Sequence, residues 1–134
     1  MTLVIDASVV VSALVDTGPT GAWAESLLVS EPLSAPHLMP VEVAGILRRS
    51  VAAGQISSDV ASMAHADLIG LPLELFPYAP FSKRIWDLRD NVTCYDAWYV
   101  SLAESLGASL ATLDLRLARS PGPTCTFQVP NFAA

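Results

Sequence analysis

The chain has 134 residues, of which 52% are hydrophobic, 13 are acidic and 7 are basic, giving a net charge of −6. This length favours a single domain spanning residues 1–134 whose core buries roughly two-thirds of the unfolded chain's surface, so no disulfide framework is needed. The acidity argues at first against a nucleic-acid partner, and no apolar run approaches the ~18 residues of a membrane span. The high apolar content indicates a surface that binds a partner protein.

The first residues of the chain and the spacing of its cysteines indicate where in the cell we expect the protein. The sequence runs directly into the apolar residues 3–5, without the basic region, long apolar stretch and cleavage signal of an exported protein, so we expect a cytoplasmic protein. Cys94 and Cys125 do not form a C-x-x-C spacing. We expect both to remain thiols with buried structural roles.

The first third of the chain is predicted to form one strand and two packed helices. Residues 3–5 are short and apolar, which is typical of a buried strand, and residues 8–15 follow as an apolar helix. Gly18-Pro19 breaks that helix, and residues 22–29 resume helical spacing.

The remainder of the chain alternates helices with strands. Helical spacing covers residues 41–53 before Gly54, 57–69 with Ser57 as N-cap, 81–88, and 94–106 before Gly107. Strands are expected at residues 73–76, 109–113 and 127–129. Strands separated by helices predict a three-layer α/β fold with a short central parallel sheet flanked by helices.

Two aspartates follow predicted strands: Asp6 comes after residues 3–5, and Asp114 after residues 109–113. The carboxyl ends of parallel strands share one edge of the sheet, where such folds open their ligand crevice. We therefore expect both carboxylates at one place. An ordinary N-cap of the following helix is the alternative for each aspartate.

Asp96 lies three residues after Thr93, a spacing that fits a capping box. Helical spacing nevertheless places Asp96 in line with the apolar residues Val100 and Ala103. A carboxylate that faces a core needs a paired charge or a metal, and no basic residue lies between Asp96 and Arg116. The sequence leaves both interpretations open and favours a ligand.

Glu42 falls in the first turn of its predicted helix, where the helix dipole alone would favour it. Gly45, one turn further on, borders the apolar face formed by Val43, Leu47 and Val51. A glycine costs about 1 kcal/mol in a helix interior. We therefore expect the missing side chain at position 45 to leave space beside the Glu42 carboxylate.

Gathered carboxylates suit Mg²⁺ or Mn²⁺, because these hard cations prefer oxygen ligands and keep positions open for water and phosphate. The candidates are Asp6, Glu42, Asp96 and Asp114. Setting these four aside leaves nine acids against seven bases, so the acidity partly belongs to a site. His37 and His65 lack partners at metal-binding spacing and are expected at the surface, and no nucleophile with an identifiable base supports a serine or cysteine hydrolase.

Four segments carry these acids: residues 3–8 (LVIDAS), 40–43 (PVEV), 93–104 (TCYDAWYVSLAE) and 112–118 (TLDLRLA). In this order they resemble the PIN-domain ribonucleases, and in particular the VapC toxins of toxin-antitoxin pairs. The third segment is the most specific, and the resemblance covers essentially the whole chain.

The resemblance implies a PIN-like fold and a divalent-metal-dependent endoribonuclease that acts as the toxin of a type II toxin-antitoxin system, with Mg²⁺ or Mn²⁺ as cofactor and RNA as substrate. It also implies a cognate antitoxin that covers a hydrophobic groove and the acidic site, in a homodimer or a toxin-antitoxin hetero-oligomer. The four acids match the catalytic and metal-ligating positions of the family. Ser8 and Thr112 match hydroxyl positions that orient the carboxylates, with local turn capping as the alternative. Family members often carry Asn where this chain has Gly45, which leaves the orientation of Glu42 open.

Phosphate contacts require basic residues, and five arginines lie nearest the four acids in sequence. They are Arg48, Arg49, Arg89, Arg116 and Arg119. The spacing of Arg116 and Arg119 also fits an ordinary solvated helix face.

Two other functions compete with the nuclease. A receiver-like phospho-acceptor domain also gathers acids at strand ends, but Lys83, the only lysine, starts a predicted helix and does not follow a strand. A catalytically inactive PIN-like interaction module is the second alternative, and a failure to bind Mn²⁺ would favour it. In all readings we expect the partner surface on Trp23, Leu27, Leu28 and the helix at residues 57–69.

Overall fold

The computed structural model describes residues 1–131 and contains a five-stranded parallel sheet with the order β3-β2-β1-β4-β5. Its strands are β1 (Leu3–Ile5), β2 (Leu33–Pro36), β3 (Leu73–Phe76), β4 (Leu110–Ala111) and β5 (Phe127–Gln128). The central strand, β1, pairs with β2 on one side and with β4 on the other. The predicted α/β fold with a short parallel sheet is confirmed.

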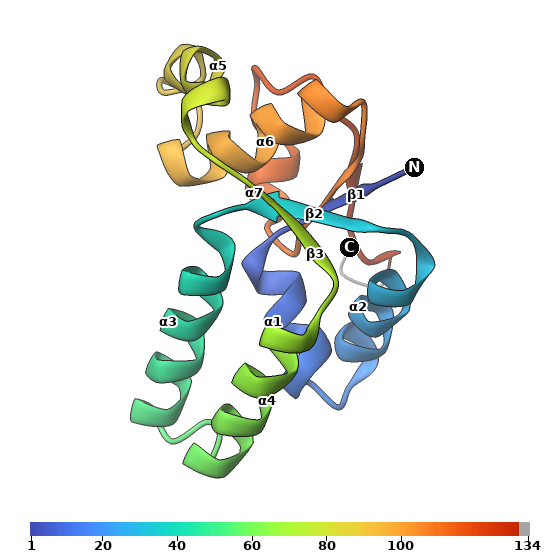
Figure 1. Ribbon diagram of the computed structural model, residues 1–134, viewed down its shortest axis with the longest axis vertical. Helices are drawn as coiled ribbons and strands as arrows, with labels where there is room; N and C mark the ends of the chain where they lie inside the picture. Colours follow the sequence, from blue (N-terminus) through green and yellow to red (C-terminus); the bar gives the residue numbers. More distant parts are fainter. Residues whose placement is uncertain (132–134) are drawn as a thin grey trace.

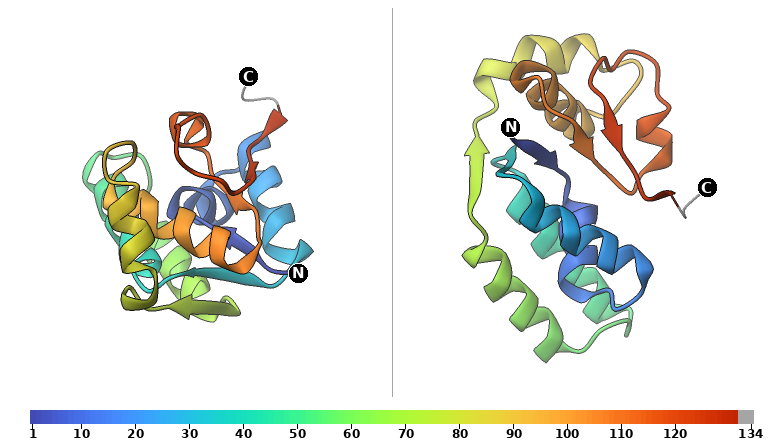
Figure 2. Two further views of the ribbon diagram at one scale, coloured as in Figure 1. Left: turned by 90° about the horizontal axis from the view of Figure 1, so that it is seen from above. Right: turned by 90° about the vertical axis from the view of Figure 1, so that its right-hand side faces the viewer.

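Helices cover both faces of this sheet. On one face lie α1 (Ala7–Val15), α2 (Pro19–Ser30), α3 (Met39–Ala52) and α4 (Ser58–Gly70), and on the other α5 (Ser82–Asp87) and α6 (Cys94–Leu106) (Figure 1). Figure 2 shows the same layers from two further sides. A 3₁₀ turn (Ala79–Phe81) precedes α5, and the short helix α7 (Leu115–Ala118) follows β4. No helix within residues 1–131 is long and apolar enough to cross a membrane.

The core lies where these layers meet. All three residues of β1 are fully buried, since α6 contacts this strand on one face and α1 belongs to the helix layer on the other. Burial on both faces is typical of a central strand in a parallel sheet. The residue that follows β1 is Asp6, so a fully buried central strand delivers a carboxylate to the sheet edge.

Strand β2 has no signal in the sequence pattern. Its residues, Leu33, Ser34, Ala35 and Pro36, include no β-branched or aromatic side chain, yet all four are buried. The strand pairs with β1 and β3 at once. Tertiary burial between two neighbours therefore overrides a weak local preference.

Helix ends follow their sequence signals with small differences. The Ser57 hydroxyl accepts a hydrogen bond from the Val60 N–H at 3.1 Å, and Gly107 ends α6 in the left-handed region with φ of 62°. Helix α2 begins at Pro19 and not at residue 22, because proline is favoured at the first helical position, where its missing N–H is not needed. The strand expected at residues 109–113 is confined to β4.

The two cysteines occupy different environments. Cys94 is exposed at the start of α6, so the buried structural role expected for it is wrong. Cys125 is half-buried, and burial raises its pKa to about 11, which keeps this thiol protonated.

Candidate active site

Asp6 caps the N-terminus of α1 and is fixed by three hydrogen bonds. Its Oδ1 accepts from the Ser8 hydroxyl at 2.6 Å and from the Val9 N–H at 3.1 Å. Its Oδ2 accepts from the hydroxyl of Thr112, a fully buried residue that directly follows β4. Burial raises the pKa of Asp6, while the bonds from Ser8 and Thr112 act in the opposite direction. The N-cap and a functional carboxylate are therefore compatible roles of one residue.

Asp114 lies beside this group, because β4 is the neighbour of β1 in the sheet. Its Oδ1 accepts from the N–H groups of Arg116 and Leu117 at 2.9 and 3.2 Å, which makes it the N-cap of α7. The Thr112 hydroxyl accepts from the Asp114 N–H at 3.0 Å, so this one hydroxyl connects both aspartates. The second oxygen of Asp114 accepts no hydrogen bond within residues 1–131.

Asp96 reaches the site from the first turn of α6. The Thr93 hydroxyl accepts from the Asp96 backbone N–H at 3.1 Å, which is one half of a capping box. The reciprocal bond, from the Thr93 N–H to the Asp96 carboxylate, is absent in residues 1–131. Asp96 is half-buried, and burial raises its pKa although the Thr93 hydroxyl and the Arg116 charge lower it. The backbone of Asp96 serves the cap, and its carboxylate is left for another purpose.

Glu42 comes from the first turn of α3, on the opposite face of the sheet from α6. Its Oε1 accepts a 2.6 Å hydrogen bond from the hydroxyl of Tyr99, which is only 2% exposed. Burial and the neighbouring Glu42 raise the pKa of Tyr99, so the phenol remains a donor. A methyl group added at Gly45 would only touch Arg49 Nη1 at 3.4 Å, so the expectation that glycine is needed to make room there finds no steric support.

The four acids line a single cavity of about 190 Å³. Its wall consists of Asp6, Ala7, Ser8, Glu42, Ile46, Asp96, Tyr99 and Asp114. These residues come from four separate segments, which the sheet topology brings together. Within residues 1–131, no group of three acidic, histidine or cysteine side chains lies close enough together to bind one ion. The carboxylates would therefore have to move closer together when a cation binds.

The carboxylates in this cavity repel one another. Burial is the largest cause that raises the pKa of Asp6, Glu42 and Asp96, because it penalises the charged form. The charge of Asp96 further raises the pKa of Asp6 and Glu42, and the charge of Asp114 further raises that of Asp96. No ion pair involves any of the four acids in the described part of the chain. A group of oxygen donors with unbalanced negative charge fits a hard divalent cation, and the absence of nitrogen and sulfur donors argues against zinc or iron.

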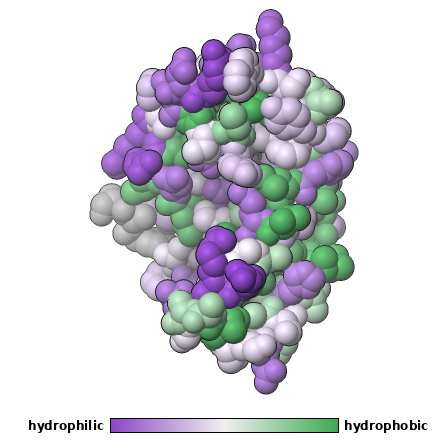
Figure 3. All heavy atoms as spheres, turned by 90° about the vertical axis from the view of Figure 1, so that its left-hand side faces the viewer, coloured by the Kyte–Doolittle hydropathy of each residue, from purple (hydrophilic) through white to green (hydrophobic). Residues whose placement is uncertain are grey.

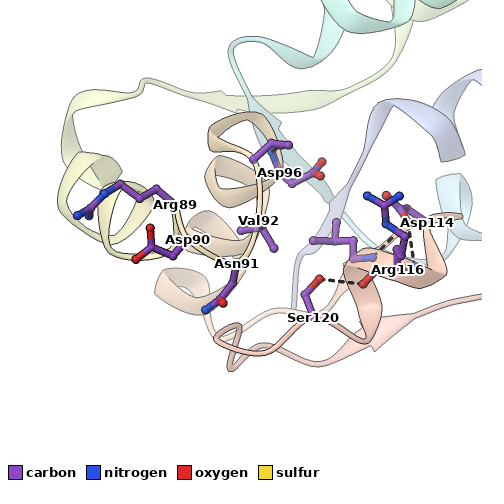
Figure 4. Close-up of a pocket in the computed structure, with 10 residues that line it drawn as sticks. Arg89, Asp90, Asn91, Val92, Asp96, Asp114, Arg116 and Ser120 are labelled. Carbon is purple, nitrogen blue, oxygen red and sulfur yellow. Dashed lines mark hydrogen bonds between the residues drawn. The ribbon is translucent and has the colours of Figure 1, made fainter.

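A second hollow of about 300 Å³ adjoins the acidic cavity. Asp96 and Asp114 line both spaces, and the larger one extends between the segment Arg89–Thr93 and the residues Arg116 and Ser120. Figure 4 shows Arg116 beside Asp114, whereas the Arg89 side chain points away from both carboxylates. Arg89 instead stacks over the Trp86 ring at 4.4 Å and donates to the Trp86 carbonyl.

The five candidate arginines therefore occupy different places. Arg116 lies at the acidic site, and Arg89 lies on the far wall of the adjoining hollow. Arg48 lines a separate hollow between α3 and α4, near His65. Arg49 lies beside Gly45, and Arg119 is exposed after α7. Both histidines are exposed, as expected.

The expected apolar partner surface needs correction. Leu27 is buried, and Trp23 and Leu28 are partly buried against the core, so these residues stabilise the fold. The exposed apolar side chains of α2 and α4 are Val29, Val60, Met63 and Ile69. On the face seen in Figure 3, hydrophobic residues are scattered between strongly hydrophilic ones.

The fold and the clustered acids define the class of the protein. A model of the PIN domain matches residues 3–122, and the protein belongs to this family. Ribonuclease VapC1 of Mycobacterium tuberculosis is 41% identical over 130 residues, which cover 94% of this chain and 96% of the relative.

Two solved structures share the fold. PAE2754 from Pyrobaculum aerophilum has a TM-score of 0.74 and 21% identity, covering 99% of this chain and 87% of the other. VapBC2 from Rickettsia felis, solved bound to a DNA fragment from its promoter, has a TM-score of 0.68 and 14% identity, covering 96% and 98%.

Proposed function

We propose that this protein is a VapC-type endoribonuclease, the toxin of a toxin-antitoxin pair, which hydrolyses RNA with Mg²⁺ or Mn²⁺. The observation that carries the proposal is the meeting of four carboxylates in one cavity, in a chain 41% identical to a protein named as a ribonuclease. Carboxylates that gather in one cavity without forming an ion pair suit a metal-dependent nuclease.

The four acids would serve as ligands for one or two cations. Asp6 and Asp96 would hold the principal ion, and Asp114 and Glu42 would complete that site or a second one. The ion supplies water activation and offsets the charge that develops on the phosphate. Ser8 and Thr112 hold the Asp6 carboxylate in place through their hydrogen bonds. Water attacks phosphorus, the P–O3′ bond breaks, and the products carry a 5′-phosphate and a 3′-hydroxyl.

Arg116 is the best placed of the basic residues to contact a phosphate of the RNA. It lines the hollow that continues from the acidic cavity, next to Asp114. Phosphate contacts fix the strand without reading its sequence. The remaining four arginines have weaker support from their positions.

The proposed partner is an antitoxin that covers an apolar surface together with the acidic site. The exposed residues Val29, Val60, Met63 and Ile69 offer apolar area on α2 and α4. A solved neighbour is the VapBC2 assembly, in which two proteins are named together. A neighbouring reading frame that encodes a short protein with a DNA-binding N-terminus and a hydrophobic, arginine-containing tail would support this assignment.

The decisive experiment is RNA cleavage by the purified protein with and without chelator. We expect cleavage of structured RNA in Mg²⁺ or Mn²⁺, complete loss in EDTA, and complete loss in Asp6→Asn, because that variant removes an anionic ligand. Asp67→Asn, which removes an exposed charge from α4, is the matched control and should retain activity. Undiminished cleavage in EDTA would contradict the metal-dependent reaction, and absence of both Mn²⁺ binding and cleavage would favour an inactive interaction module.

A further inference from the structure

The hydrogen bond between Tyr99 and Glu42 joins two helices on opposite faces of the sheet. Tyr99 belongs to α6 and Glu42 to α3, 57 residues apart, and the Tyr99 hydroxyl lies 2.6 Å from Glu42 Oε1. The Tyr99 ring is 2% exposed, yet the residue lines the same cavity as the four acids. A phenylalanine would fill the same volume, so packing alone does not explain the hydroxyl.

Glu42 has no other fixed partner. Within residues 1–131, the Tyr99 hydroxyl is the one side-chain donor to its carboxylate, and no ion pair restrains it. The neighbouring turn of α3 offers no donor at position 45, because that residue is glycine. Without Tyr99, a flexible glutamate side chain would sample several rotamers at the mouth of the cavity.

Asp114 shows a similar arrangement by other means, with one oxygen held, whereas Asp6 is held at both oxygens. Backbone N–H groups hold one oxygen of Asp114, and hydroxyl and N–H donors hold Asp6. In Glu42, the Tyr99 bond engages Oε1 and leaves Oε2 without a hydrogen bond in the described residues. A carboxylate that is held at one oxygen presents the other to a cation at a smaller loss of rotational freedom.

We propose that Tyr99 is a positioning residue whose hydroxyl holds Oε1 of Glu42, so that Oε2 is presented to the bound divalent cation. This inference rests on the proposed metal-dependent function. It assigns to α6 a second contribution to the site, one turn beyond Asp96.

The test is Tyr99→Phe, which keeps the ring and removes the hydroxyl. Tyr78→Phe is the matched control, because Tyr78 is 45% exposed and its hydroxyl makes no hydrogen bond within residues 1–131. We expect Tyr99→Phe to melt cooperatively, to bind Mn²⁺ about tenfold more weakly by electron paramagnetic resonance of the free ion, and to lose about tenfold in kcat with little change in KM for RNA. Tyr78→Phe should match the wild type.

A double-mutant cycle decides whether Tyr99 acts through Glu42. In the Glu42→Gln background, adding Tyr99→Phe should change Mn²⁺ affinity less than about twofold, since the carboxylate it serves is gone. Fully additive losses, an unchanged Mn²⁺ affinity in Tyr99→Phe, or loss of its cooperative melting would each overturn the proposal. Wild-type protein that neither binds Mn²⁺ nor cleaves RNA would instead overturn the proposed function itself.

Discussion

The position of Asp96 near the start of a helix has two explanations, a helix cap and a metal ligand. Its backbone N–H is capped by Thr93, while its carboxylate joins the acidic cavity. Because like charges cluster there without metal, we predict that Asp96→Asn leaves the metal-free protein equally or more stable. Mn²⁺ at 100 times its dissociation constant should then stabilise the wild type by about 2.7 kcal/mol and the variant far less. Thermal melts with and without Mn²⁺ test this, and equal responses of the two proteins would refute the ligand role.

The same residue gives a prediction in pH. Burial raises the pKa of Asp96 in the folded state, so the folded protein binds its proton more tightly than the unfolded chain. The stability from this group is complete below the ordinary pKa of 3.8 and is lost as the pH rises through the folded value. In EDTA, the melting temperature of Asp96→Asn should therefore rise relative to the wild type between pH 4 and pH 7. If the difference in melting temperature between Asp96→Asn and the wild type stays constant or shrinks as the pH rises, the predicted direction of the pKa shift is wrong.

For individual residues, the sequence predicted which acids form the site, but it did not predict the tyrosine that is hydrogen-bonded to one of them. Asp6 and Asp114 were expected together because each follows a strand, and the parallel sheet does place them in one cavity. Tyr99 was missed, since its acceptor lies 57 residues away and no local spacing relates the two. The one available sign was its position three residues after Asp96, which puts both on neighbouring faces of one helix.

Among the elements, the junction of α1 and α2 depends on a close approach at Gly21. A Cβ atom there would lie 1.8 Å from the Asp16 carbonyl oxygen, a contact that requires backbone movement. We predict that Gly21→Ala destabilises the protein by about 3 kcal/mol in urea unfolding. Gly45→Ala is the matched control within α3, and it should stabilise by about 1 kcal/mol because a methyl group would meet only the flexible Arg49 side chain, at 3.4 Å. Equal effects of the two substitutions would contradict this reading.

The helices with a clear period were predictable, and so were the short strands β1 and β3, which match the strands expected at residues 3–5 and 73–76. Helix α6 matches its expected range of residues 94–106 because apolar spacing, an N-cap threonine and a C-terminal glycine agree. Strand β2 was not expected, because its four residues include no β-branched or aromatic side chain. Tertiary contacts set β2, which pairs with β1 and β3, whereas α7 begins at a local cap formed by the Asp114 carboxylate.

For the whole molecule, a net charge of −6 must coexist with the proposed binding of RNA, which is a polyanion. The acidic cavity accounts for part of this charge, and Arg116 supplies a local positive group beside it. We predict that Arg116→Gln raises KM about equally for different RNA sequences and reduces the slope of log affinity against log salt by about one contact, roughly 0.7 for a single strand. Lys83→Gln removes the same charge from the start of α5 and should leave the slope unchanged. An unaltered slope in Arg116→Gln would remove this residue from the RNA path.

Because β1 pairs with β4, the two sides of the site are translated at different times. Asp6 and Thr112 are hydrogen-bonded across 106 residues, so Asp6 is translated long before the strand that completes its surroundings. At ~5–20 residues per second, this interval lasts on the order of 5–20 seconds. During this interval the nascent chain therefore lacks the side of the cavity that Thr112 and Asp114 complete. The proposed antitoxin would have that interval in which to reach the nascent chain before the cavity closes.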